Sequence, residues 1–157
     1  MSEEASDKRA RLRRSARLAA VQALYQMELA GAGASEVTRE FLSHRFGHDD
    51  EPGDYLAADE AFFEDLLSGV VKAQDRVDET IRSTLKTGWK LSRLDSTLRA
   101  ILRAGGYELL ERSDVPVGVV INEYVDIAHA FYEGSEPGFI NASLESFARR
   151  VRPEAFN

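Results

Sequence analysis

The stretch 93–111, RLDSTLRAILRAGGYELLE, decides the fold class of this 157-residue chain. Its apolar side chains recur every three or four residues, which is the spacing of one helix face, and they do not alternate as in a strand. The positions expected to face inward are Leu94, Leu98, Ile101, Leu102, Leu109 and Leu110. Gly105 and Gly106 lie inside this helix, where each costs roughly 1 kcal/mol relative to alanine. We therefore expect a close helix crossing that needs their missing side chains.

The same periodicity covers almost every other segment of the chain. It predicts helices over about 8–30, 36–46, 59–85, 116–132 and 139–151, with candidate kinks at Gly69 and Asp75. Breaks are expected at Gly31, Gly88 and Gly134, and residues 48–54 form an acidic loop. Almost no segment alternates as a strand would. The sequence therefore predicts an all-α protein of about seven helices.

Length and composition limit the class of protein. A chain of 157 residues with 43% hydrophobic and 30% charged residues is expected to form one domain, burying roughly 70% of its unfolded surface. The absence of cysteine excludes disulfides, iron–sulfur clusters and thiol catalysis, and it is typical of a reducing cytosol. No segment approaches the ~20 apolar residues of a membrane span. We expect a soluble, cytoplasmic protein with no membrane contact.

The net charge of −7 conceals an uneven distribution. Residues 8–18 contain five arginines, one lysine and no acid, and so carry +6. The first thirty residues carry +2 in all, which leaves −9 on the remaining 127. This pattern argues against a protein that coats nucleic acid over its whole surface, but it is compatible with one local basic landing site.

No catalytic or cofactor-binding arrangement is recognisable. His44 and His48 have the spacing of a metal pair, but a solvated helix end is favoured, because the further ligand candidates fall in the acidic loop and no glutamate stands at the second position of an HExxH motif. Gly31-Ala-Gly33 follows a helix, where a phosphate-binding loop would follow a strand. The sequence therefore predicts no enzymatic activity, no metal and no cofactor.

The segment 8–17, which we call the basic arm, contains the most informative residues. On a helix, Arg13, Arg14 and Arg17 are expected to form one cationic edge, with Arg9 close to it. Guanidinium groups fork onto phosphate oxygens and stack on unpaired bases. Nucleic-acid binding is favoured, while binding to an acidic protein or membrane surface, or plain solvation, remains open.

The chain as a whole resembles the NusB family of bacterial transcription antitermination factors. The resemblance rests on an ordered set of motifs: 17–25 RLAAVQALY, 62–70 FFEDLLSGV, 94–95 LD, 98–103 LRAILR, 107–109 YEL, Pro116, 120–123 VINE, 127–128 IA and 139–141 FIN. It differs from the family where Ala142, Ser143, Leu144 and Glu145 follow the last motif, and residues 48–54 are an insertion. The first difference puts close approach of the last helix in doubt.

The resemblance implies two packed three-helix bundles with an extra helix. We place these in one domain, as an N-terminal bundle over 1–87 that includes the basic arm and a C-terminal bundle over 88–157. Family members bind the single-stranded boxA element of nascent ribosomal RNA together with the ribosomal protein NusE. They promote read-through by RNA polymerase, alongside NusA and NusG. Some members self-associate, so a homodimer is also open.

The resemblance also implies site residues. The RNA-binding candidates are Arg9, Arg13, Arg14, Arg17, Gln22, Tyr25, Phe139 and Asn141, and the NusE-binding candidates are Tyr107, Glu108, Glu111 and Val117. Phe139 and Tyr25 are equally open to packing inward. Two other functions stay open: a helical protein-interaction module indifferent to RNA sequence, and a fragment of an RNA cytosine methyltransferase, which would need a catalytic domain and a cysteine.

Overall fold

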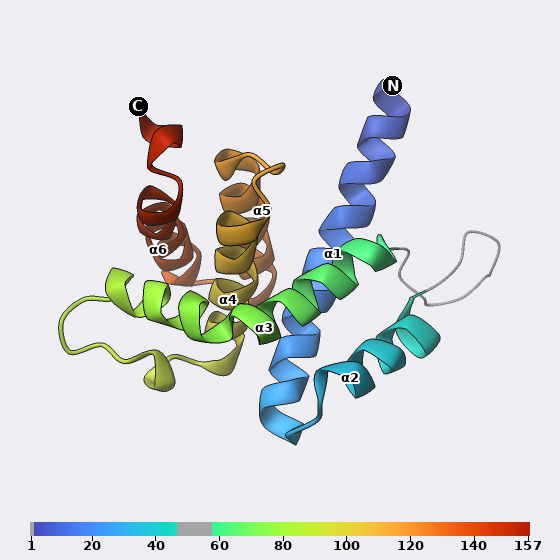
Figure 1. Cartoon of the computed structure of the whole chain (residues 1–157), viewed down its shortest axis with the longest axis horizontal. Coiled ribbons are helices and arrows are strands. Elements are labelled where there is room, and N and C mark those ends of the chain that lie inside the picture. Colours follow the sequence, from blue (N-terminus) through green and yellow to red (C-terminus); the bar gives the residue numbers. More distant parts are fainter. Residues whose placement is uncertain (1, 47–57) are drawn as a thin grey trace. The chain divides into compact units, whose positions relative to one another are not determined.

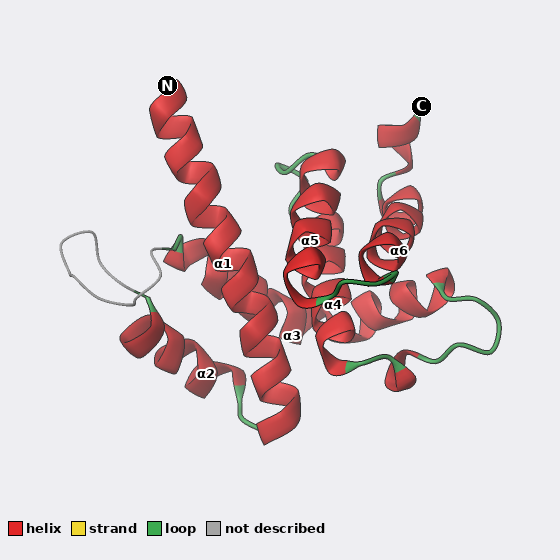
Figure 2. Ribbon diagram, turned by 180° about the vertical axis from the view of Figure 1, so that it is seen from behind, coloured by secondary structure: helices red, strands yellow, loops and turns green. Residues whose placement is uncertain are grey.

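The computed structural model describes residues 2–46 and 58–157 and is helical throughout them (Figure 1). Its helices are α1 (Glu3–Ala30), α2 (Ala34–Glu40), α3 (Glu60–Thr84), α4 (Ser96–Glu111), α5 (Val117–Phe131) and α6 (Glu136–Val151). A π-helical turn at Phe41–Arg45 and 3-10 turns at Leu91–Arg93 and Pro153–Phe156 complete the described elements. Figure 2 shows no strand in these residues. The all-α prediction is confirmed, and the loop expected over 48–54 lies outside the described residues.

Helix starts differ from the expected positions where the residue that caps the helix lies elsewhere. α1 begins well before residue 8 because the Ser2 side chain accepts a hydrogen bond from the Ala5 amide and stabilises the first turn. α4 begins later than expected because Asp95 is its cap and accepts from the Thr97 amide. Helix ends agree more closely, and Gly31 ends α1 in the left-handed conformation at φ +67°.

The chain divides into two compact units, Met1–Ser68 and Gly69–Asn157. The division falls within α3, upstream of the boundary expected between 87 and 88. In the first unit, a cluster of Phe41, Phe46 and Phe63 joins the π-helical turn to the start of α3. The Phe41 and Phe63 rings are stacked with centroids 5.4 Å apart, and Phe46 meets Phe63 edge to face at 4.9 Å. These three aromatic rings form much of the core at this end of the unit.

In the second unit, α4, α5 and α6 pack on one another and lie side by side in Figures 1 and 2. The two glycines of α4 make this packing possible. A Cβ atom at Gly105 would lie 3.0 Å from Leu144, and one at Gly106 would lie 2.9 Å from the Phe147 ring. Both contacts are tighter than ordinary van der Waals packing. The expected close crossing is confirmed, and the helix that Gly105 and Gly106 approach is α6.

Within the described residues, no helix is long and apolar enough to cross a membrane.

Candidate nucleic-acid interface

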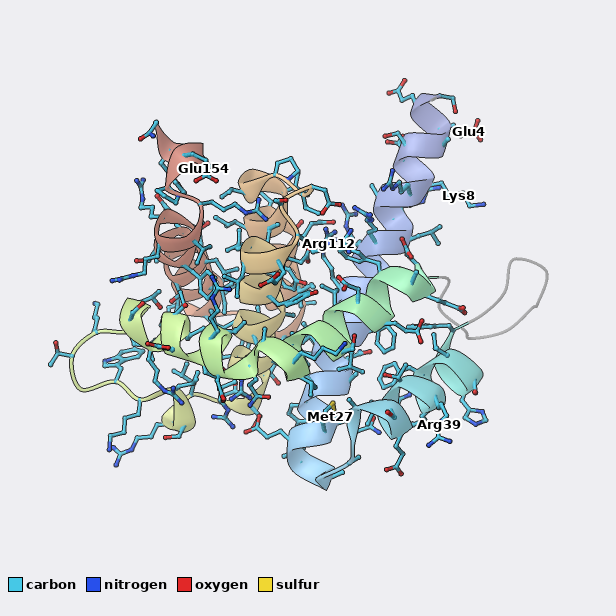
Figure 3. The ribbon with its side chains drawn as sticks, in the orientation of Figure 1. Glu4, Lys8, Met27, Arg39, Arg112 and Glu154 are labelled. Atoms are coloured by element: carbon cyan, nitrogen blue, oxygen red, sulfur yellow. The ribbon has the colours of Figure 1, made fainter. Side chains whose placement is uncertain are left out.

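One exposed face of α1 contains two arginines of the basic arm and two further RNA-binding candidates. Arg11, Arg14, Gln22 and Tyr25 are all exposed, Tyr25 by 39%. Arg11 and Arg14 are three residues apart, as are Gln22 and Tyr25, and the two pairs are separated by eight residues, slightly more than two helical turns. The four side chains therefore lie along one side of the helix. Figure 3 shows Glu4 and Lys8 projecting from the first turns of the same helix. The arm therefore continues into a polar and aromatic stripe.

Arg13 and Arg17 lie on a different side of α1. The Arg13 guanidinium carbon is 4.6 Å from the centroid of the Phe62 ring, and that of Arg17 is 5.0 Å away. Arg17 is only 2% exposed. Arg13 is half-buried and Arg14 is exposed, so the cationic edge predicted for these three residues does not face solvent as a whole. The aromatic ring at the start of α3 turns two of the three inward, where cation–π contact compensates part of their lost hydration.

The start of α3 is held against the arm by two contacts of Asp59, which also caps the helix. Its carboxylate lies 3.8 Å from Arg13, its other carboxylate oxygen accepts from the Phe62 amide at 3.0 Å, and its own amide donates to the Leu12 carbonyl at 3.0 Å. Asp59 thus caps α3 and joins it to α1. Arg13 and Arg17 set the rotation of α1, and Arg9 and Arg14 are the predicted arginine contacts that remain exposed.

Arg11 is a surface residue of the basic arm that was not among the predicted RNA-binding residues. Its side chain is exposed, one turn before Arg14. The sequence contains a signal for this role, because helical spacing places Arg11 on the same side of α1 as Arg14, Gln22 and Tyr25. The burial of Arg17 shows that this side faces solvent.

A polar cluster fixes the later turns of α1 beside Tyr25. Gln26 donates to the Glu40 carboxylate at 2.8 Å, and Arg45 donates to the other Glu40 oxygen at 3.2 Å. The Gln26 hydrogen bond, followed by that of Arg45, lowers the pKa of Glu40 below its ordinary value. These contacts tie α1 to α2 and the π-helical turn, and so they hold the stripe on α1 in one orientation.

The remaining RNA-binding candidates lie in the second unit, on α6. Asn141 is exposed. Phe139 is half-buried, and its ring is stacked on that of Trp89, with centroids 5.7 Å apart and planes at 26°. Trp89 itself is 53% exposed. Phe139 therefore packs on another surface ring. It is neither fully packed in the core nor left fully exposed to stack on a base.

Two of the four candidates for partner binding are interior residues. The Tyr107 ring occupies the space that a side chain at position 69 would need, and a Cβ atom built on Gly69 would lie 2.1 Å from it. Glu108 is 0% exposed and accepts a hydrogen bond from the Tyr124 hydroxyl at 2.6 Å. These side chains stabilise the helix packing and present no surface. The sequence does not indicate this burial, because a buried carboxylate is recognisable only by its donor on another helix.

The other two partner candidates lie on either side of the α4–α5 turn. Glu111 is exposed and lies 3.6 Å from Arg76, while Val117 is half-buried in the first turn of α5. Within the second unit, they are the members of the candidate set that remain accessible.

Arg152 holds the α4–α5 turn in place. Its guanidinium donates to the backbone carbonyls of Glu108, Leu109, Arg112 and Val115 over 2.6–2.8 Å. The Glu108 and Arg112 carbonyls also accept from the Arg112 and Val115 amides, whereas Arg152 is the donor to the Leu109 and Val115 carbonyls. Burial lowers the pKa of Arg152. The residue after α6 thereby positions the segment between Glu111 and Val117.

The groups weighed for metal or phosphate chemistry do not assemble in the described residues. His44 is exposed, and His48 lies outside the described residues. Within 2–46 and 58–157, no three His, Cys, Asp or Glu residues come together as metal ligands would. The Gly31-Ala-Gly33 segment is the end of α1 and the cap of α2.

Comparison with known proteins is consistent with this fold and with the sequence motifs. The model of the NusB family matches residues 14–149. The transcription antitermination protein NusB of Maricaulis maris (strain MCS10) is 57% identical over 154 residues, covering 98% of this chain and 96% of the relative. The protein of the same name from Caulobacter vibrioides is 59% identical over 137 residues, covering 87% and 92%. These names describe antitermination factors and no enzymatic activity.

Solved structures show the same architecture. T. maritima NusB has a TM-score of 0.76 and 26% identity, covering 91% of this chain and 95% of that chain. A chain from the crystal structure of antitermination factors NusB and NusE in complex with dsRNA shares the fold, with a TM-score of 0.72, 22% identity and coverage of 87% and 96%. Since the family model spans most of the sequence and the relatives match nearly its full length, the chain belongs to the NusB family.

Proposed function

We propose that this chain is an RNA-binding antitermination factor which, together with NusE, binds the boxA element of nascent ribosomal RNA and promotes read-through by RNA polymerase. The observation that carries the proposal is the stripe on α1, where exposed arginines are followed on the same face by Gln22 and Tyr25. Phosphate contacts, edge hydrogen bonds and stacking are the three interactions with which proteins read single-stranded RNA. The names of the relatives and the NusB–NusE–RNA complex that shares the fold support it.

The exposed positions suggest a role for each RNA contact. Arg9, Arg11 and Arg14 bind phosphates, Gln22 and Asn141 bind base edges, and Tyr25 and Phe139 stack on bases. Arg13 and Arg17 act as positioning residues, because their stacking on Phe62 sets which face of α1 is presented. They also add positive potential to the arm without needing a direct phosphate contact.

NusE binding is proposed for the surface around the α4–α5 turn. Glu111 and Val117 supply an exposed carboxylate and an apolar contact there, and Tyr107 and Glu108 support the surface from within. The −9 charge outside the first thirty residues would steer a basic ribosomal protein toward the chain. NusA, NusG and RNA polymerase are the further partners in this proposal.

The experiment measures affinity for a boxA RNA and for a scrambled RNA, with and without NusE, across a salt series. We expect NusE to increase the affinity for boxA more than for the scrambled RNA. Higher salt should weaken binding, because binding releases cations condensed on the RNA and this release is less favourable at high salt. If neither NusE nor RNA sequence changes the affinity, the chain is a helical interaction module and the antitermination proposal is wrong.

A further inference from the structure

We propose a second base-binding site in the Gly69–Asn157 unit: Trp89 and Phe139 form a stacking platform for an unpaired RNA base, with Lys86, Lys90 and Arg93 holding the adjoining phosphates. The site lies on the connection between α3 and α4, residues 85–95, which is the yellow-green segment of Figure 1, and at the start of α6. The proposal rests on the RNA-binding function above and extends the RNA footprint from Phe139, already assigned there, to Trp89 and three cationic side chains.

The backbone on both sides of Trp89 is fixed. Gly88 has φ +90°, which an L-residue rarely adopts, and the Trp89 amide donates to the Lys86 carbonyl at 2.9 Å, closing a turn. Directly after Trp89, the 3-10 turn Leu91–Arg93 is anchored by Leu91, which is 4% exposed. The indole is therefore displayed from an ordered turn and not from a loose loop.

The exposure of the indole is more than packing alone requires. Phe139 covers Trp89 at 5.7 Å with nearly parallel planes, and 53% of the residue still faces solvent. An indole enclosed on both faces would not expose so large a fraction. A large aromatic surface left in water is unfavourable unless a ligand covers it. The platform therefore has one face supported by Phe139 and further surface available for another ring.

The charge around the platform indicates the ligand. Residues 85–94 contain Lys86, Lys90 and Arg93 and no acid, in a chain whose net charge is −7. All three cationic side chains are exposed, and among the described residues none of them makes a hydrogen bond or ion pair. Strongly hydrated ammonium groups without a carboxylate partner are available to phosphate.

The first acid after this segment is already engaged. One carboxylate oxygen of Asp95 accepts from the Thr97 amide at 2.9 Å, and the other accepts from the Tyr132 hydroxyl. Burial, together with this hydrogen bond to Asp95, raises the pKa of Tyr132, so the hydroxyl keeps its proton as donor. Asp95 thus acts in the α4 cap and does not neutralise the three cations through any contact in the structure.

An exposed aromatic ring beside several cations matches a single-stranded nucleic acid, since the base stacks while the phosphates pair with the cations. An acidic peptide would use the cations but would leave the indole without a partner ring. The geometry therefore favours RNA over an acidic protein.

The test uses the full chain and its single tryptophan. Binding of a fluorescein-labelled boxA RNA is followed by anisotropy, and the Trp89 fluorescence is followed in a parallel titration with unlabelled RNA. We expect RNA to quench Trp89, and the same RNA with abasic positions, which keeps its phosphates, to quench it less. Trp89→Ala should weaken binding roughly tenfold, and Trp89→Phe should retain most of the affinity.

Matched controls separate stacking from general effects. Phe131 is another exposed aromatic residue of this unit, 45% exposed, and Phe131→Ala should leave RNA affinity unchanged. Lys90→Ala should reduce the salt dependence more than Lys72→Ala, which removes an exposed lysine from α3. Melting temperatures measured for each variant exclude unfolding as the cause, and Trp89→Phe keeps the aromatic packing on Phe139.

Three results would overturn the platform. If the RNA binds by anisotropy while Trp89 fluorescence and the affinity of Trp89→Ala are unchanged, the platform is wrong and the proposed function stands. If polyglutamate and abasic RNA quench Trp89 as strongly as boxA RNA, the patch binds an acidic protein. If no RNA binds with or without NusE, the platform and the proposed function both fail.

Discussion

At the scale of single residues, Arg14 and Arg17 are three positions apart on α1 and have different surroundings. Arg14 is exposed on the arm, whereas Arg17 is 2% exposed and stacks over Phe62. The same type of side chain therefore has a different role at each position. Arg14 lies on the surface, where a phosphate can reach it, while Arg17 contributes to the packing of α1 on the start of α3.

Replacing each of these arginines by alanine separates binding from stability. Arg14→Ala should reduce the slope of log affinity against log salt by about 0.7, one phosphate contact on a single strand, with an unchanged melting temperature. Arg17→Ala should lower the melting temperature, since it removes a buried cation–π contact. Arg39→Ala, an exposed arginine of α2, is the control for charge alone. Equal salt slopes for Arg14→Ala and Arg39→Ala would remove Arg14 from the site.

Arg152 is the residue whose loss should cost most stability. Arg152→Ala leaves the Leu109 and Val115 carbonyls without a donor, while the Glu108 and Arg112 carbonyls keep backbone amide donors. We expect a loss of about 3–5 kcal/mol in the free energy of unfolding. Urea denaturation measures it. Arg150→Ala is the control, because Arg150 is exposed and makes one hydrogen bond to the Ser83 carbonyl. Similar losses for both variants would show that the four carbonyl contacts contribute little.

At the scale of elements, glycines set how closely the helices of the second unit approach. Gly69 on α3 admits the Tyr107 ring of α4, and Gly105 and Gly106 on α4 admit side chains of α6. In an isolated helix each glycine is unfavourable. The close packing that they allow outweighs this local cost. The glycines therefore stabilise the contacts between helices, although each one destabilises its own helix.

Adding a methyl group at position 69 tests this. Gly69→Ala should destabilise the protein by about 1–3 kcal/mol, because the Tyr107 ring must move, even though alanine is the better helix former. Gly118→Ala is the control: nothing lies within 4 Å of a Cβ there, and it should stabilise by about 0.4–1 kcal/mol. Thermal and urea unfolding measure both. Stabilisation by Gly69→Ala would mean that Tyr107 has room to rearrange.

At the scale of the whole molecule, opposite charges occupy different parts of the chain. The basic arm carries +6 over residues 8–18, and the chain beyond residue 30 carries −9. Such a distribution allows an RNA and a basic protein to bind one chain without competing for the same charges. In the proposed complex, the arm takes RNA and the acidic remainder takes NusE.

This distribution predicts the kinetics of partner binding. The association rate constant for NusE in the absence of RNA should fall as ionic strength rises, because salt screens the long-range attraction between the acidic remainder and a basic protein. The dissociation rate should change less. Stopped-flow mixing at low and physiological salt measures both rates. An association rate independent of salt would assign no steering role to the acidic surface.

The helices were predictable from sequence, and the site was predictable only in part. Apolar spacing alone predicts α3, α4 and α5 to within a few residues, since periodicity is a local property. The basic arm was equally visible as an acid-free run of arginines. The roles of Tyr107 and Glu108 were not predictable, because the atoms that enclose them, Gly69 and the Tyr124 hydroxyl, come from other helices.

The sequence by itself determined the helical class, the order of the helices and the place of the basic arm, since each depends on the spacing of neighbouring residues. Only the tertiary structure decided which arginines face solvent. Helical spacing gives the angles between Arg11, Arg13, Arg14 and Arg17 but not the rotation of α1 about its own axis. That rotation is set by what packs against the helix, and here Phe62 and Asp59 at the start of α3 turn Arg13 and Arg17 inward and leave Arg11 and Arg14 on the surface.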